Sequence, residues 1–400
     1  MFLQYAPAGA LVPLFSLRLE KDLHFDSIQL SRAAAMSALA NLLAPLVVGQ
    51  VADRWVPAER CLTVCAAAAA VLAWNLAELT TPSAVLLASL AFWLMMVPVF
   101  TLGTSITFTH LSYPELSFGR VRLWGTVGWM VPGWLLGLWF SEWNGLPRHS
   151  GFADAFRLAA ILAAAVALYG LTLPHTPPQR RAGALLAPLA ALPLLRGRSV
   201  AIFALCVLGT CATLPFSTQV TPLLLSHHGV PRDLLSPTLT LAQSTEALCL
   251  GLLPMLLLRC GLRGTMLLGL GTWAVALSVL AVGRPLPLVA GSLVLHGLYI
   301  CCFLVAGQVF LNSRARGDVR VSMQGLFSCL AGMGLLIGNL SVGVVRERVQ
   351  GDFTATFAVA AAVTAALLLV FLLGFREEEP SADCPTAPGC TRRSGPPGGR

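Results

Sequence analysis

Residues 232–258, RDLLSPTLTLAQSTEALCLGLLPMLLL, form an apolar segment long enough to cross a bilayer, and two polar side chains lie near its middle. Gln243 and Glu246 are three residues apart, so they share one face if the segment is helical. A charged side chain at bilayer mid-depth costs about 2.5–3.5 kcal/mol on insertion scales and usually has a functional role. We therefore expect this face to line a transport path.

The composition of the whole chain indicates a polytopic membrane protein. Of its 400 residues, 56% are hydrophobic and 11% are charged, and the mean hydropathy is +0.77, whereas a soluble domain carries about 25% charged residues. The first residues lead directly into apolar sequence without a basic region or a small-residue cleavage site, so we expect no cleaved signal peptide. The net charge of +8 comes almost entirely from arginines in short loops, which favours positive-inside topology over nucleic-acid binding.

Twelve segments match the length of about 20 apolar residues that a spanning helix needs. They lie at roughly 1–19, 28–51, 61–79, 84–110, 121–141, 153–173, 199–226, 232–258, 265–283, 286–312, 321–345 and 353–375. We predict an all-α integral membrane protein with twelve transmembrane helices in two six-helix bundles, residues 1–173 and 199–375. A central cytoplasmic loop at 174–198 would join the bundles, and a disordered cytoplasmic tail would follow from 376 to 400.

The distribution of arginines predicts that both termini are cytoplasmic. With this orientation the inner loops contain Arg54, Arg60, Arg120, Arg122, Arg180, Arg181, Arg196, Arg198, Arg259, Arg263, Arg314, Arg316 and Arg320. Fewer basic residues remain for the outer loops and helix ends.

The end of the second segment, Gly49-Gln50-Val51-Ala52-Asp53-Arg54-Trp55, resembles the G-x-x-A-D-R signature of the major facilitator superfamily. In that superfamily the motif joins the second and third helices. Gly49 would allow close helix approach, and Asp53 would cap a helix or pair with arginine charges at neighbouring helix ends, which helps to hold one conformation of a rocking carrier. Gly49, Asp53 and Arg54 are the expected residues of this conformational motif. The alternative is a capped turn with an incidental ion pair.

The fifth segment carries a stripe of three side chains suited to a solute. Arg122, Thr126 and Trp129 are spaced i, i+4 and i+7, so they share a helix face. A cation, a hydroxyl and an aromatic ring suit a polar solute that contains a ring. Arg and Trp are also common as anchors at a membrane boundary, and the spacing leaves that alternative open.

A narrower resemblance covers roughly residues 2–375. The stretches that carry it, in order, are Phe2-Leu3-Gln4-Tyr5, Gly49 to Trp55, Pro98 to Phe108, Arg122 to Gly128, Leu173 to Pro177, Gln243 to Glu246, His296-Gly297, Gly307-Gln308 and Ser322 to Gly325. Together they resemble the nucleoside:proton symporter family of the major facilitator superfamily. The resemblance implies a bacterial inner-membrane carrier that takes up nucleosides with protons. It also implies that Arg122, Thr126, Gln243 and Glu246 surround the substrate and that Trp129 occupies the position of an aromatic.

Two positions depart from the pattern of that family. Cys301 stands where the family usually has an acidic residue in the tenth helix. In the seventh helix, residues 214–218 lack an expected glutamine, and Gln219 lies nearby on a different face. The solute and the proton coupling therefore both stay open at this point.

Glu246 and His296 are the candidates for proton coupling. Most of the 18 acidic residues fall in loops, helix ends or the tail, and Glu246 is the only clearly mid-span carboxylate in the sequence. Desolvation favours a protonated carboxyl group and a nearby cation favours an ionised one, so a glutamate balanced between them can load and release a proton. Alternatively, Glu246 only stabilises packing, and His296 is a hydrogen-bonded packing residue.

No catalytic or metal-binding pattern is present in the sequence. We find no nucleophile–base pair and no phosphate-binding loop, and Cys61 and Cys65 have no neighbouring ligand that would complete a metal site. We therefore expect no enzyme activity, no cofactor and no metal. The expected partners are a nucleoside or similar small polar solute, protons and the lipid bilayer, with no nucleic acid, and the protein would be a monomer. A carrier of another solute, such as a sugar or a drug-like molecule, and a non-transporting membrane sensor are the alternatives.

Overall fold

The computed structural model describes residues 1–111, 114–141, 151–178, 197–314 and 320–376, except for the side chains of residues 45–50, 52–54, 114–120, 312–314 and 320–322. All regular structure within these ranges is helical, and they contain no β-strand. The prediction of an all-α chain is confirmed for this part of the protein.

Each of the twelve predicted segments coincides with helical structure. The first half contains α1 (Phe2–Leu11), η1 (Val12–Leu14), α2 (Phe15–Leu17), η2 (Arg18–Asp22), α3 (Ser27–Arg54), α4 (Ala58–Glu78), α5 (Pro82–His110), α6 (Pro114–Phe140) and α7 (Ala153–Gly170). The second half contains α9 (Arg198–His227), α10 (Arg232–Leu239), α11 (Leu241–Val282), α12 (Leu286–Tyr299), η5 (Ile300–Val305), α13 (Ala306–Arg314), α14 (Arg320–Arg348) and α15 (Phe353–Gly374).

Eight helical stretches among the described residues are long and apolar enough to cross a membrane. The count of twelve spans stays a prediction. The first segment is interrupted at Val12–Leu14, because Pro13 removes a backbone donor and crowds the preceding turn, whereas α1 continues through Pro7. Residues 241–282 form one long helix with a kink at Gly261, whose φ of 66° is favourable for glycine alone. The kink lies between the two segments predicted at 232–258 and 265–283.

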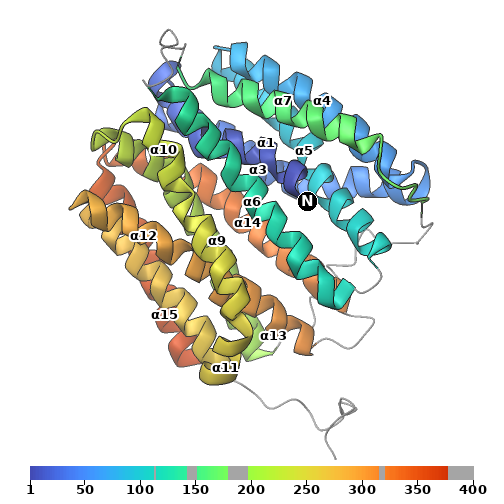
Figure 1. Cartoon of the computed structure of the whole chain (residues 1–400). Coiled ribbons are helices and arrows are strands. Elements are labelled where there is room, and N and C mark those ends of the chain that lie inside the picture. Colours follow the sequence, from blue (N-terminus) through green and yellow to red (C-terminus); the bar gives the residue numbers. More distant parts are fainter. Residues whose placement is uncertain (112–113, 142–150, 179–196, 315–319, 377–400) are drawn as a thin grey trace, which may run out of the picture.

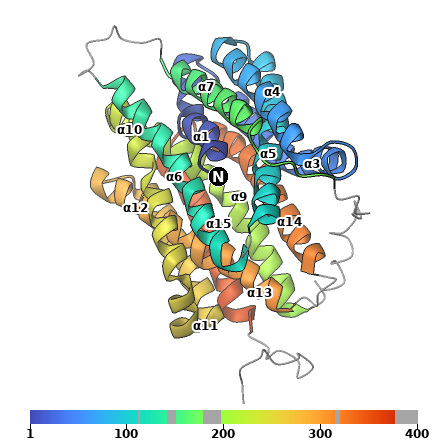
Figure 2. The ribbon, with the colours of Figure 1, turned by 45° about the vertical axis from the view of Figure 1, so that its right-hand side comes forward.

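The helices form two groups that lie side by side. Helices α1 to α7 lie together, and α9 to α15 form the second group beside them (Figures 1 and 2). Helix α3 packs on α14 where Gly343 lies against Ser31, and α6 packs on α10 where Gly137 lies against Pro237. Small residues at these crossings let the backbones approach closely, as is usual between helices in a membrane.

Charged side chains join the two groups at one end of the molecule, which we call the Arg346 end. Arg346 of α14 forms an ion pair with Glu20 of η2 at 2.6 Å. The guanidinium of Arg232 in α10 lies 5.0 Å from the centre of the Phe152 ring, just before α7. The two groups are therefore held together at the end where η2, α7 and α10 meet.

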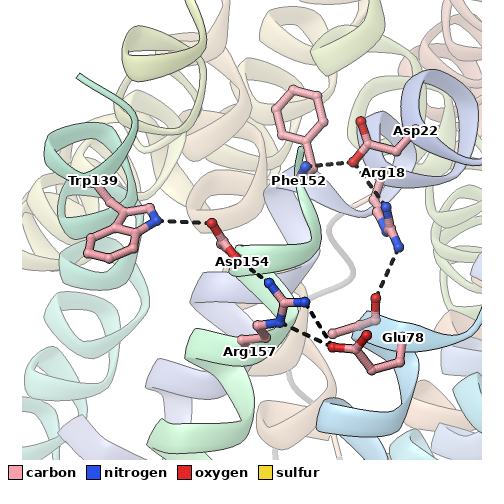
Figure 3. A network of polar contacts seen from close by, with 8 residues as sticks. Arg18, Asp22, Glu78, Trp139, Phe152, Asp154 and Arg157 are labelled. Carbon is pink, nitrogen blue, oxygen red and sulfur yellow. Dashed lines mark hydrogen bonds and ion pairs between the residues drawn. The ribbon is translucent and has the colours of Figure 1, made fainter. Parts of the chain in front are cut away.

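A polar network ties the helices of the first group at the same end (Figure 3). Arg18 pairs with Asp22 at 3.2 Å and donates to the carbonyl of Ala77, and the amide of Phe152 donates to Asp22 at 2.6 Å. Nearby, Arg157 bridges Glu78 and Asp154, each at 2.8 Å, and Trp139 donates to Asp154. Asp22, Glu78 and Asp154 are therefore each engaged in an ion pair within the first group, and these three carboxylates serve its internal packing.

Candidate functional site

Helices α6 and α11, from the two groups, meet near the residues that the sequence singles out. The indole N–H of Trp134 donates to the hydroxyl of Thr240 at 3.0 Å. Four residues earlier on α6 and four residues later on α11, the hydroxyl of Ser244 lies 3.9 Å from the sulfur of Met130. Four residues make about one turn, so Thr126 lies one turn before Met130 on α6, and Gln243 and Glu246 lie in the same turn of α11 as Ser244.

Arg122 faces an aromatic surface inside its own group and a carboxylate of the other group. Its guanidinium carbon lies 4.5 Å from the centre of the Tyr5 ring. Tyr5 in turn stacks on Phe100, with ring centres 4.8 Å apart. Arg122 is also near enough to Glu246 for the two charges to interact. The structure thus brings together the two charged residues that the sequence predicts for the site.

The polar groups of this site are available to a ligand. Within the described part of the chain, the side chains of Arg122, Gln243 and Glu246 make no hydrogen bond to another residue. In contrast, the carboxylates of Asp22, Glu78 and Asp154 near the helix ends all have partners, as Figure 3 shows. An uncommitted guanidinium offers five donors, and an ionised carboxylate accepts only, so the pair can hold groups of both kinds.

Thr126 and Trp129 lie where α6 packs on α1. Thr126 is buried and Trp129 is partly buried against the apolar core. Gly9 of α1 lies directly against the backbone of Trp129, and Gly128 lies against the backbone of Phe2. The two helices are therefore in close contact along the stripe that carries the predicted solute-binding residues.

The turn of α11 that carries Glu246 packs on α12 and is close to Cys301. Gly297 of α12 lies against the backbone of Glu246 and Ala242, where any larger residue would collide. Cys301 follows in the π-helical turn η5, is fully buried, and lies within electrostatic range of Glu246. Single π-helical turns often occur at functional sites. The position that departs from the family pattern is therefore a neighbour of Glu246.

His296 lies in an aromatic cluster of the second group. Its ring meets the Trp273 ring edge-on at 5.1 Å, and Trp273 stacks on Tyr299 at 4.9 Å. The indole N–H of Trp273 donates to Thr213 at 2.9 Å. This contact is that of a packing residue, and the proton role of His296 stays a prediction.

Gln219 is committed to a partner away from Glu246. Its amide donates to the side-chain carbonyl of Asn339 at 2.6 Å, between α9 and α14, and both side chains are buried. The structure thus agrees with the expectation that Gln219 uses a different face from that of the missing glutamine.

The superfamily motif lies in the last turns of α3, where the side chains of Gly49, Asp53 and Arg54 fall outside the described residues. At the neighbouring start of α4, Glu59 accepts from His175 at 2.8 Å and from the amide of Thr176 at 3.0 Å. The proposed conformational role of the motif therefore stays a prediction.

Sequence reasoning missed Tyr5 as a member of the site. The signal was present, because Gln4-Tyr5 interrupts an apolar first segment and belongs to the stretch that carries the family resemblance. A single aromatic in a membrane helix has no pattern that points to its partner, and only the packing of α1 on α6 reveals Arg122 beside it.

Comparison with known proteins identifies the family. A family model described as nucleoside H+ symporter matches residues 1–380. Among curated relatives, the putative nucleoside transporter YegT of Escherichia coli (strain K12) is 28% identical over 95% of this chain and 93% of its own length. Xanthosine permease from the same organism is 26% identical over 94% of each chain, and nucleoside permease NupG is 25% identical over 86% of each.

Solved structures show that the fold is shared. The structure of nucleoside transporter NupG matches with a TM-score of 0.82 at 24% identity, and the match covers 94% of this chain and 97% of that one. A POT family transporter matches with a TM-score of 0.71 at 13% identity, over 93% of each chain. Since the family model spans nearly the whole sequence, this chain belongs to the nucleoside:proton symporter family.

Proposed function

We propose that this protein is a secondary active transporter that moves nucleosides across a bacterial inner membrane together with protons. The observation that carries the proposal is the placement of Arg122 and Glu246, which come from different helix groups and lie near enough for their charges to interact without forming an ion-pair contact. Membership of the nucleoside:proton symporter family and the names of its relatives support the substrate class.

The architecture that we propose is twelve transmembrane helices in two six-helix bundles, residues 1–173 and 199–375. The central loop at 174–198 and both termini would be cytoplasmic, and the protein would be a monomer. The match of helices to apolar segments and the distribution of arginines support this arrangement. Alternating access would then occur as the bundles rock around a central site.

Five residues would recognise the nucleoside. Ribose hydroxyls both donate and accept hydrogen bonds, and bases carry ring nitrogens and exocyclic groups of both kinds. Arg122 would donate, Glu246 would accept, and Gln243 and Thr126 can do either. Trp129 would pack against a ring of the solute. Substrate contacts from both groups would link binding to their relative movement.

Glu246 would carry the proton. When it is ionised, its attraction to Arg122 draws the two helix groups together, and protonation removes that attraction. Proton binding therefore changes the force between the groups, which is what coupling to a rocking movement requires. Cys301 contributes a thiol where the family usually has a carboxylate, so Glu246 would have to act without a second acid there.

Uptake into proteoliposomes tests this proposal. With an inward proton gradient, wild-type protein should accumulate labelled uridine or adenosine above equilibrium. Glu246→Gln removes the ionisable group and keeps its size, so it should abolish accumulation and leave exchange of labelled for unlabelled nucleoside. Glu347→Gln is the matched control, because Glu347 is exposed at the Arg346 end and should not affect either process. Normal accumulation by Glu246→Gln would refute the proton role.

A second candidate is a carrier of another small polar solute. The change at Cys301 and the absence of the expected glutamine in α9 favour it, since both alter side chains that the family resemblance assigns to the helix-seven and helix-ten sites. Thermal stabilisation of the purified protein by a sugar, with none by any nucleoside in the same panel, would decide for this second function.

A further inference from the structure

The first helix supplies an aromatic ring to the charged pair. Tyr5 lies on α1, and two partners from other helices contact its ring. One is the guanidinium of Arg122 on α6, at 4.5 Å, and the other is the Phe100 ring on α5, at 4.8 Å and inclined by 29°. A guanidinium within about 6 Å of a ring centre is attracted by the electrostatic field of the ring face.

Close packing of α1 on α6 holds this ring in place. A side-chain carbon at Gly125 would approach the Nη1 atom of Arg122 to 2.8 Å and the edge of Tyr5 to 2.9 Å, so only glycine leaves room for both groups. On either side of this contact, Gly9 and Gly128 bring the two backbones together. The ring of Tyr5 therefore has little freedom to move away from Arg122.

An aromatic partner leaves the N–H donors of Arg122 unoccupied, whereas a carboxylate partner would use them. A carboxylate beside Arg122 would occupy two of its N–H groups and neutralise its charge. A ring face stabilises the cation and leaves the N–H donors unoccupied. Within the described part of the chain the Arg122 guanidinium makes no hydrogen bond and no ion pair with a short N–O contact, which agrees with this arrangement.

We propose that Tyr5 is a positioning residue for substrate recognition, which holds the guanidinium of Arg122 toward α11 with its donors free for the solute. The proposal rests on the proposed function in taking Arg122 as a residue that binds the substrate. Tyr5 itself acts through Arg122, so its loss should weaken solute binding and change the maximal transport rate little.

Replacement by fluorinated rings separates electrostatics from packing. Fluorine withdraws charge from a ring face while keeping its shape nearly constant. We therefore compare Tyr5→Phe with the same position carrying phenylalanine that has one, three or five fluorine atoms. Counterflow of labelled uridine in proteoliposomes measures KM and Vmax for each protein. A contact of this kind is about 1–2 kcal/mol in a desolvated site, which corresponds to a rise in KM of about 5- to 30-fold.

The expected series is a KM near that of the wild type for Tyr5→Phe and a stepwise rise with each added fluorine, at nearly constant Vmax. Pentafluorophenylalanine at Phe357, a buried core ring of α15, is the control and should leave KM unchanged. Tyr5→Leu should match the most fluorinated protein, and its thermal unfolding shows whether it is folded. In an Arg122→Gln background, fluorination should have no further effect.

This design distinguishes failure of the proposed function from failure of the inference about Tyr5. If wild-type protein carries no nucleoside, the proposed function fails, and the fluorination series is repeated with the solute that a counterflow panel identifies. If wild-type protein carries a solute and KM does not respond to fluorination at position 5, Tyr5 is only a packing residue and the inference is overturned. Equal effects in the presence and absence of Arg122 would overturn it as well.

Discussion

Removing the charge of Glu20 should loosen the Arg346 end of the protein. Glu20 and Arg346 come from different helix groups and pair at 2.6 Å, and their side chains are 26% and 6% exposed. They line a cavity of about 390 Å³ together with Phe25, Ser27 and residues after α14. In Glu20→Gln the buried Arg346 guanidinium would lose its ion-pair partner, and Asp26 and Glu347 in the same cavity form no ion pair with it. The state in which this end is closed should therefore lose stability.

The size of the effect follows from the burial of the two partners. Breaking a fully buried ion pair costs about 3–5 kcal/mol, whereas an exposed pair contributes about 0.2–1 kcal/mol. With one partner buried and the other a quarter exposed, we expect an intermediate loss of about 2 kcal/mol. That loss corresponds to a change of about 30-fold in the ratio of closed to open molecules.

Distances between spin labels measure this ratio directly. Lys21→Cys and Arg348→Cys place labels on the two groups at exposed positions of the Arg346 end. Cys260, the exposed native cysteine among the described residues, and the tail cysteines Cys384 and Cys390 are replaced by serine. Glu20→Gln should enlarge the population with long distances. Glu347→Gln removes a charge from the same cavity and serves as the control.

The reasoning also predicts a rescue. The double substitution Glu20→Arg with Arg346→Glu restores opposite charges across the contact, so it should return the distance distribution toward that of the wild type. An unchanged distribution in Glu20→Gln, or an equal change in the Glu347→Gln control, would refute the assignment of the ion pair as a contact that closes this end.

Two further predictions concern helix packing and are checked by thermal unfolding in detergent. Gly128→Ala places a carbon against the backbone of Phe2 and should lower the free energy of unfolding by about 1–3 kcal/mol. Gly251 has open space around it, so the control Gly251→Ala should be neutral or stabilising. Equal losses of stability in both variants would contradict the packing of α1 on α6. Gln219→Leu leaves the buried side-chain carbonyl of Asn339 without its donor and should cost about 1–3 kcal/mol. Replacing both residues by leucine should cost less than the sum of the two single changes.

Much of the helical organisation could be predicted from the sequence, because it depends on local properties. An apolar run of about 20 residues has to satisfy its backbone internally in a bilayer, so its length determines where helices lie. The interruption between the segments at 232–258 and 265–283 was predicted in the same way, and it coincides with the kink at Gly261. The interruption of the first segment after Leu11 follows from Pro13, which the sequence displays.

The candidate site was only partly predictable. Glu246 could be identified from the sequence alone because a carboxylate in the middle of an apolar segment is costly, and Arg122 and Thr126 share a helix face by spacing. The spacing left open whether Arg122 is an interfacial anchor. The structure favours the site, because it brings Arg122 near Glu246 and leaves its hydrogen-bonding groups unoccupied among the described residues.

By itself, the sequence determined that this is a helical membrane protein with one conspicuous mid-span carboxylate, because burial cost and helix periodicity act over a single segment. Only the tertiary structure decided which side chains meet: Tyr5 with Arg122, Gln219 with Asn339, and Cys301 near Glu246. Between apolar helices in a bilayer there is little hydrophobic preference for one partner over another. Contact then depends on small residues and on shape, and these properties belong to pairs of segments far apart in the chain.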